Sequence, residues 1–329
     1  MNALIKVFKS HIHNGLVSCA PNLENASAFI CDSHLDPDNY AMPVLNESAS
    51  TVISLLEQGR FDEVEDKLTF EPTKTIRGVI RVMVRTHLNR QGVGHVSRGS
   101  ADKTLAKRVL LPFENDFDYQ KMLDHDYFAE QWEEALEAHP AEYDEIDRQS
   151  IAGLRKLRGG QRTNARVAKH LGIHDNWAKV FTGIYSGLQF LDNNYHFNAE
   201  ALWSDMNACE NDIEATKRLV KKVQTGIHQY GEALAGSFLA DLGHAGFVKP
   251  DTHVISSVAA MCGRESVPSQ SAVDYVYKLA ETLSMEPRAV DKLFYLGCSG
   301  KLYLYNLGMK NPRQFKSDFL NDLGPLGQL

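Results

Sequence analysis

Residues 227–255 restrict the possible fold of this chain more than any other stretch. Their apolar residues recur at helical spacing, but Gly231 interrupts the pattern and predicts a tight turn between two helices. The second helix is expected to stop at Gly243, because glycine commonly follows a helix C-terminus. Pro250-Asp251-Thr252 then predicts the start of another helix, over residues 253–261. The expected order is helix, tight turn, helix, loop, and a carboxylate at the entrance of a further helix.

This order resembles the helix-hairpin-helix and aspartate motif of the HhH-GPD superfamily of DNA glycosylases. The family hairpin reads roughly L-P-G-V-G-x-x-x-A, and a loop ending in V/P-D-T/V-H-V/I follows it. The matching residues are Ile227, Tyr230, Gly231 and Ala235 in the hairpin, and Pro250-Asp251-Thr252-His253-Val254 after it. The departures are His228 for the proline, Gln229 for the first glycine, and Ala233 where bifunctional members carry the Schiff-base lysine.

The resemblance implies an all-α protein with a helix-hairpin-helix DNA glycosylase-like fold and an N-terminal helical extension. Strand-like alternation of apolar and polar residues is scarce along the whole chain, which agrees with an all-α fold. We expect two parts: a mostly helical, acidic region over residues 1–148 and a glycosylase-like region over residues 149–329. Further helices are expected over residues 271–283 and 288–307.

The resemblance also implies an activity, which is the release of a modified or damaged base flipped out of double-stranded DNA. Asp251 is the residue matched to catalysis, where it would stabilise the oxocarbenium charge of the sugar and activate water. Ala233 cannot form an imine, so the expected enzyme is monofunctional. Lys249 is expected to contact phosphate, with a role as an amine nucleophile as the alternative. A specialised target such as modified phage DNA would suit the large N-terminal region.

The expected DNA contacts fall into two groups. The motif places Gln229, Gly231, Lys249 and His253 at the DNA, and its hairpin carbonyls allow a monovalent cation. A separate basic stretch places Arg158 and Arg162 around Gly159-Gly160, a pattern that suits phosphate binding but also fits a solvated helix face.

A base pocket is expected to involve Tyr195, His196 and Glu232. The other aromatic residues between 174 and 209 recur at helical intervals, so most of them should lie in the core. Arginines 77, 81 and 85 form a stripe on one predicted helix. That stripe could hold phosphates, but a solvated face paired with local acidic residues is the favoured interpretation.

Two simpler interpretations of the chain stand beside catalysis. Pro-Asp-Thr before an apolar run is a common helix start, in which Asp251 only caps free amides, and both roles can coexist. A non-catalytic DNA-binding protein on the same fold is therefore the alternative function. A purely structural helical protein is a third possibility.

Composition restricts the remaining function classes. The net charge is −7, but the acidic excess lies before residue 149 and the remainder is mildly basic, so DNA binding is not excluded. The five cysteines show no CxxC spacing, which predicts a reducing, cytoplasmic setting and neither zinc nor an iron–sulfur cluster. No apolar run is long enough to cross a bilayer, and the N-terminus lacks the apolar core of a signal peptide. No obligate protein partner is inferred.

Overall fold

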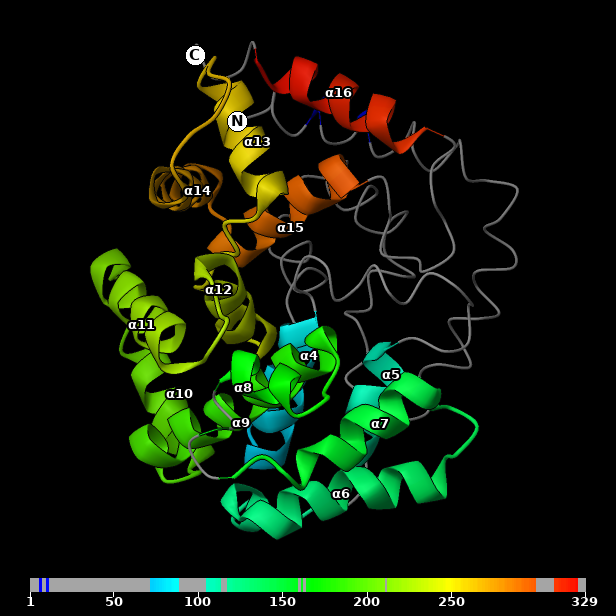
Figure 1. The fold of residues 1–329 in the computed structure, drawn as a ribbon. Coiled ribbons are helices and arrows are strands. Elements are labelled where there is room, and N and C mark those ends of the chain that lie inside the picture. The colour runs from blue at the N-terminus through cyan, green and yellow to red at the C-terminus, as the bar shows by residue number, and fades with distance from the viewer. Residues whose placement is uncertain are drawn as a thin grey trace, which may run out of the picture. The chain divides into compact units, whose positions relative to one another are not determined.

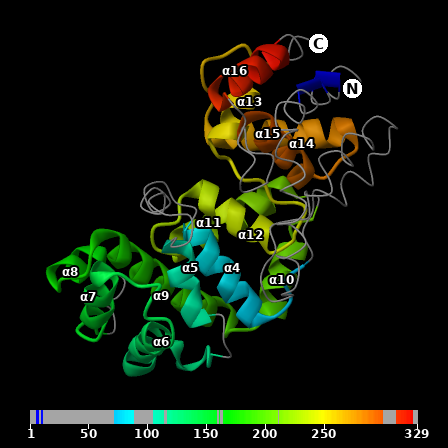
Figure 2. The same ribbon diagram turned by 90° about the vertical axis from the view of Figure 1, so that its right-hand side faces the viewer.

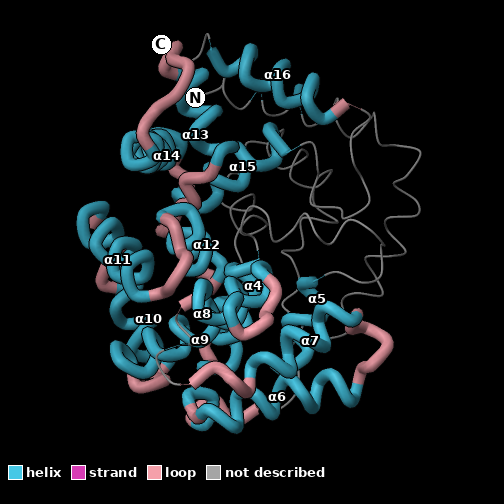
Figure 3. The backbone as a smooth tube through the Cα atoms, viewed as in Figure 1, coloured by secondary structure: helices cyan, strands magenta, loops and turns pink. Residues whose placement is uncertain are grey.

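The computed structural model describes residues 6–7, 10–11, 72–88, 105–113, 117–158, 161, 164–210, 212–299 and 311–324. Every regular element among these residues is a helix, so the all-α prediction is confirmed for this part of the chain (Figure 3). Arg162 and the Gly159-Gly160 pair lie outside it.

The chain forms two compact units, which we describe separately. The central unit is Thr73–Asp241, and the terminal unit combines Met1–Pro72 with Leu242–Leu329. The boundary expected near residue 148 does not coincide with this division, because it falls inside helix α7 (Glu145–Leu154) of the central unit. The hairpin therefore belongs to the central unit, whereas Asp251 belongs to the terminal unit.

The central unit is a bundle of helices of very different lengths (Figure 1). Besides α7, its α-helices are α4 (Ile76–Leu88), α5 (Leu105–Leu110), α6 (His125–Ala138), α8 (Ala165–His170), α9 (Asp175–Tyr195), α10 (Ala199–Asn207), α11 (Ile213–Gly226) and α12 (Glu232–Asp241). Short 3-10 turns cover Leu111–Phe113 and Lys121–Leu123. α9 packs against α4, α8 and α11, while α12 contacts both α4 and α11.

Aromatic residues of α6 and α9 form the core of the central unit. The Trp132 ring meets those of Trp177 and Phe181 edge-on, with ring centres 5.5 and 5.0 Å apart. The expected core aromatics Trp177, Phe181, Tyr185, Phe190 and Phe197 are buried as predicted. Tyr195, which was expected in the base pocket, is buried as well. Trp203 is only half-buried, and its indole N–H donates to the Thr73 carbonyl at 2.7 Å.

The arginine stripe on α4 differs from the favoured expectation. Arg77 and Arg81 are half-buried, and their Nε atoms donate to the backbone carbonyls of Phe117 and Phe113 at 3.1 and 2.6 Å. These bonds satisfy carbonyl groups in and beside the 3-10 turn after α5. The two side chains therefore hold an irregular segment onto α4, which a solvated face would not do.

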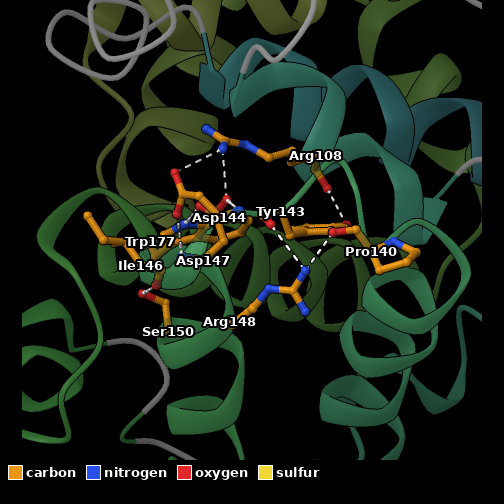
Figure 4. Close-up of polar contacts among 9 residues, drawn as sticks. All are labelled: Arg108, Pro140, Tyr143, Asp144, Ile146, Asp147, Arg148, Ser150 and Trp177. Carbon is orange, nitrogen blue, oxygen red and sulfur yellow. Dashed lines mark hydrogen bonds and ion pairs between the residues drawn. The ribbon is translucent and has the colours of Figure 1, made fainter.

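A buried ion pair joins α5, α7 and α9 (Figure 4). Arg108 lies in α5 and donates to Asp147 Oδ2 at 2.7 Å. The same oxygen accepts the Asp144 amide at 2.8 Å, and Oδ1 accepts the Trp177 indole N–H at 2.7 Å. Asp144 and Asp147 also form a capping box at the start of α7. One carboxylate thus connects three helices that are far apart in the sequence.

Among the described residues, the terminal unit contains α13 (Thr252–Met261), α14 (Ser269–Leu283), α15 (Pro287–Ser299) and α16 (Pro312–Leu323), shown from a second side in Figure 2. α15 packs against the other three. Its Gly297 lies against the Phe319 ring of α16, where a larger residue would collide. The helix expected over residues 271–283 is confirmed, and the one expected from Arg288 is confirmed as far as Ser299.

We expect removal of the Asp147 carboxylate to destabilise the central unit strongly. Asp147→Ala leaves the Arg108 guanidinium buried without its main carboxylate partner, and breaking such a pair costs about 3–5 kcal/mol. All three tryptophans lie in the central unit, so urea unfolding followed by tryptophan fluorescence measures this loss.

The matched control is Asp144→Ala. The Asp144 side chain is 60% exposed, so its replacement should cost only the cap, about 1 kcal/mol. An equal loss of unfolding free energy in the two variants would show that burial does not determine how much the Arg108–Asp147 pair contributes to stability.

Candidate functional site

The predicted hairpin is present in the central unit. α11 ends at Gly226 and α12 begins at Glu232, and the Tyr230 amide donates to the Ile227 carbonyl at 3.1 Å inside the turn. Gln229 has a φ of 69°, the left-handed region that glycine favours. Gln229 stands where the resembled family has its first glycine, so the turn keeps a glycine-like backbone at a cost of roughly 1–2 kcal/mol.

Neighbouring helices hold this strained turn in place. The Tyr230 hydroxyl donates to the Met83 carbonyl of α4 at 2.8 Å, and the His228 amide donates to the Ser186 hydroxyl of α9 at 2.8 Å. The side-chain Nε2 of Gln229 donates to the Thr182 hydroxyl at 3.4 Å. Gly231 is exposed, and a side chain there would meet no atom within 4 Å. The turn is therefore anchored on its inner side and open at Gly231.

Asp251 caps α13 in the terminal unit. Its Oδ1 accepts the amides of His253 and Val254 at 2.8 and 3.2 Å. The side chain is 16% exposed, and Oδ2 lies 3.8 Å from the Lys249 amine. The capping role expected from Pro-Asp-Thr is thus real, and it uses one carboxylate oxygen for both amides. Oδ2 takes no part in the cap.

The two residues before Asp251 form a tightly held turn. The Lys249 amide donates to Asp291 Oδ2 of α15 at 2.9 Å, and the Lys249 carbonyl accepts the Asp251 amide at 2.7 Å. Pro250 lies between Lys249 and Asp251; it is buried, and its ring fixes its own φ. The position of Asp251 relative to α15 is therefore set by the two hydrogen bonds that the backbone of Lys249 makes.

The upstream part of the same loop is also attached to the helices of the terminal unit. The Tyr277 hydroxyl of α14 donates to the Gly246 carbonyl. The Arg288 amide donates to the Ala245 carbonyl at 2.9 Å, which gives a partner to a first-turn amide of α15. The loop leading to Asp251 is consequently part of the packed structure of this unit.

Buried charges lie next to Asp251. Asp291 is 3% exposed and accepts Arg288 Nη1 at 2.9 Å, and Lys292 is 8% exposed. Burial raises the pKa of the Asp291 carboxyl; Arg288 and Lys292 oppose this, and the charge of Asp251 raises the pKa further. The two carboxylates are thus close enough to interact electrostatically.

His253 follows the cap and packs against α15. Its ring meets Tyr295 edge-on, with ring centres 5.3 Å apart. Burial lowers the pKa of its imidazole, against the raising effect of Asp251, while Lys316 and Lys249 lower it further. The ring is therefore neutral at pH 7, and any DNA contact through it would be a hydrogen bond between a neutral imidazole and phosphate.

The other sequence-predicted site residues lie elsewhere. Tyr195 is 4% exposed; its hydroxyl donates to Asp205 and accepts from Lys222, both at 3.0 Å, and burial raises its pKa to about 12. This packing leaves little of the ring for stacking on a base. His196 is exposed with a φ of 48°. Arg158 is exposed after α7, and Glu232 is half-buried in the first turn of α12.

The structure thus brings together Lys249, Asp251 and His253 in the terminal unit, and Gln229, Gly231 and Glu232 at the hairpin of the central unit. Sequence reasoning missed the Arg288–Asp291 pair. The available signal was a pair of opposite charges three residues apart in an apolar helix, at a spacing that places both on one face.

No protein-family model matches the chain, and comparisons with curated proteins and with solved structures also gave no match. Among the described residues, no helix is long and apolar enough to span a membrane. The same residues hold no cluster of three or more His, Cys, Asp or Glu side chains that could bind a metal ion. Their cysteines, Cys209, Cys262 and Cys298, are not in disulfides.

The capping role of Asp251 can be measured separately from any chemistry. Asp251→Ala removes the acceptor of two amides and should lower the unfolding free energy of the terminal unit by about 1 kcal/mol. Asp251→Asn keeps an acceptor oxygen, so the unfolding free energy should fall by only about a few tenths of a kcal/mol. Thermal unfolding followed by circular dichroism, with hydrogen exchange of the α13 amides, checks both values. An Asn variant as unstable as the Ala variant would mean that the charge, not the cap, holds α13.

Proposed function

We propose that this protein is a monofunctional DNA glycosylase that flips a modified or damaged base from double-stranded DNA and hydrolyses its N-glycosidic bond. One observation carries the proposal: Asp251 is a largely buried carboxylate with one oxygen committed to the α13 cap and the other outside it. The sequence around it, Pro250-Asp251-Thr252-His253-Val254, follows a turn between two helices in which Gln229 has a left-handed backbone.

The proposed reaction breaks the bond between the sugar C1′ and the base nitrogen. Positive charge develops on the sugar as the base leaves, and a fixed carboxylate close to C1′ stabilises it. Water then forms a new bond to C1′, and Asp251 Oδ2 accepts the proton that this water loses. The products are the free base and an abasic site.

The surroundings of Asp251 suit this role. Two amide N–H groups at a helix N-terminus donate to one oxygen of the carboxylate, and the Lys249 amine lies 3.8 Å from the other, so the carboxylate is held in a fixed orientation. Lys249 is only 24% exposed in the side chain and lies beside the carboxylate, so it could move onto a phosphate when DNA arrives. That exchange would leave Oδ2 for the sugar and water.

The hairpin supplies a second part of the proposal. The first amides of α12 have no carbonyl partner within their own helix, and the open side of Gly231 lets a phosphate approach them. Such a contact holds the strand without reading its sequence. Arg158, exposed after α7, is a further proposed phosphate contact, together with Arg162, which lies outside the described residues.

The direct test is base release by Asp251→Asn. Duplexes carrying oxidised, alkylated, deaminated or hypermodified bases are incubated with the protein, and free base is detected by mass spectrometry. On the substrate so found, Asp251→Asn should lower the rate on the order of 10²-fold or more while DNA affinity is kept, because it removes charge that stabilises the transition state.

Asp124→Asn provides a matched control, since Asp124 caps α6 through the same kind of bonds to the amides of Asp126 and Tyr127. It should release base at the wild-type rate. Full activity of Asp251→Asn would exclude the catalytic assignment. Salt-dependent DNA binding without release of any base would favour the alternative, a non-catalytic DNA-binding protein.

The monofunctional character makes a separate prediction. Ala233 occupies the position of the amine nucleophile in bifunctional members of the resembled superfamily, so borohydride should trap no covalent protein–DNA adduct. Gel electrophoresis of the borohydride-treated reaction measures this. An adduct that disappears in Lys249→Ala would show that an amine nucleophile has moved to Lys249, which already lies beside the carboxylate.

A further inference from the structure

Asp291 is a buried carboxylate that the chemistry proposed above does not use. It lies in α15 among apolar residues of the terminal unit core. Removing such a group from water costs several kcal/mol, and well-packed apolar residues often replace a buried ion pair without loss of stability. A role in packing alone therefore explains its presence poorly. Its hydrogen bonds point to a second role.

Those bonds lead directly to Asp251. Asp291 Oδ2 accepts the Lys249 amide at 2.9 Å, and the Lys249 carbonyl accepts the Asp251 amide at 2.7 Å. The Asp251 carboxylate in turn accepts the first amides of α13. Asp291 thus anchors one end of the three-residue turn whose other end is the start of α13. Because only the buried Pro250 separates Lys249 from Asp251, a displacement of the Lys249 backbone would also displace Asp251.

The charge of Asp291 has its own use. The side chains of Arg288 and Lys292 are almost fully buried beside it, and Arg288 Nη1 donates to the same oxygen that accepts the Lys249 amide. Arg288 and Lys292 both lower the pKa of the Asp291 carboxyl, and Asp291 therefore offsets part of their positive charge beside the loop that carries Asp251.

We propose that Asp291 is the positioning residue for Asp251, holding the Lys249–Asp251 turn through the Lys249 amide and compensating Arg288 and Lys292. Asp291 itself touches neither base nor sugar. This role rests on the proposed glycosylase function, since it matters to the chemistry only if Asp251 acts on DNA. A displacement of about 1 Å at a reacting group can cost 10²-fold in rate, so a fixed turn has a kinetic consequence.

The test compares Asp291→Ala with Asp291→Asn on the duplex from which the wild-type protein releases a base. We expect Asp291→Ala to lower the single-turnover rate on the order of 10²-fold, with the Kd for DNA within about twofold of wild type. Asp291→Asn keeps an acceptor for the Lys249 amide and should recover about tenfold of that loss. Hydrogen exchange of the Lys249 amide in the free protein should be faster in Asp291→Ala and close to wild type in Asp291→Asn.

Leu283→Ala is the control for stability. Leu283 is buried in α14 of the same unit, and its truncation should destabilise by about 2–5 kcal/mol while removing none of the hydrogen bonds that hold the loop. Rates are measured below the melting temperatures of all variants. A wild-type rate in Asp291→Ala, or an equal loss in Leu283→Ala, would overturn the positioning role.

The two proposals fail in distinguishable ways. If the wild-type protein releases no base from any duplex, the glycosylase function fails and the positioning role fails with it. If Asp251→Asn is inactive but Asp291→Ala is not, only the positioning role is overturned. Should Asp291→Ala not fold, Asp291→Asn still decides: a protected Lys249 amide with a rate loss as large as that of Asp251→Asn, or an unprotected amide with a wild-type rate, would contradict the hydrogen-bond relay.

Discussion

The need to satisfy backbone amides at helix N-termini organises much of this protein. Each helix begins with amides that have no partner within the helix, and a fold of many short helices has many such ends. Aspartate and asparagine side chains accept them throughout the described residues, with Asp124, Asn198 and Asp212 as examples in the central unit. Asp251 is one of these caps. The proposed chemistry adds a second duty to a group that the helix already requires.

Buried ion pairs are the second device, and the described part of each unit holds an example. Arg108 and Asp147 join three helices of the central unit, and Arg288 and Asp291 lie within one helix of the terminal unit. Their extra acceptor bonds differ in purpose. Asp147 accepts hydrogen bonds from the Trp177 indole and from the Asp144 amide at the α7 cap, and these bonds fix the packing of helices. Asp291 accepts a hydrogen bond from the Lys249 amide, and this bond fixes a loop. That difference is why we assign a functional role only to Asp291.

The turn between α11 and α12 shows how tertiary contacts can hold a strained residue. Gln229 has a left-handed backbone, and Met83, Thr182 and Ser186 of two neighbouring helices accept hydrogen bonds from residues of this turn. These bonds and the burial of Tyr230 offset the strain at Gln229.

Local features could be read from the sequence alone. Helical periodicity predicted the all-α character of the described residues, Pro250-Asp251-Thr252 predicted the cap of α13, and the interruption before Gly231 predicted the hairpin. These depend on residues within a few positions of one another, where backbone geometry and side-chain type are enough.

Other features were decided only by tertiary structure, because they join residues that are distant in sequence. Nothing local shows that Arg77 and Arg81 reach the carbonyls of residues 117 and 113, or that the Tyr195 hydroxyl is enclosed by Asp205 and Lys222. The bond from Lys249 to Asp291 spans 42 positions. The sequence by itself determined which carboxylate caps α13; the packing of α15 against the preceding loop decided how firmly that carboxylate is held.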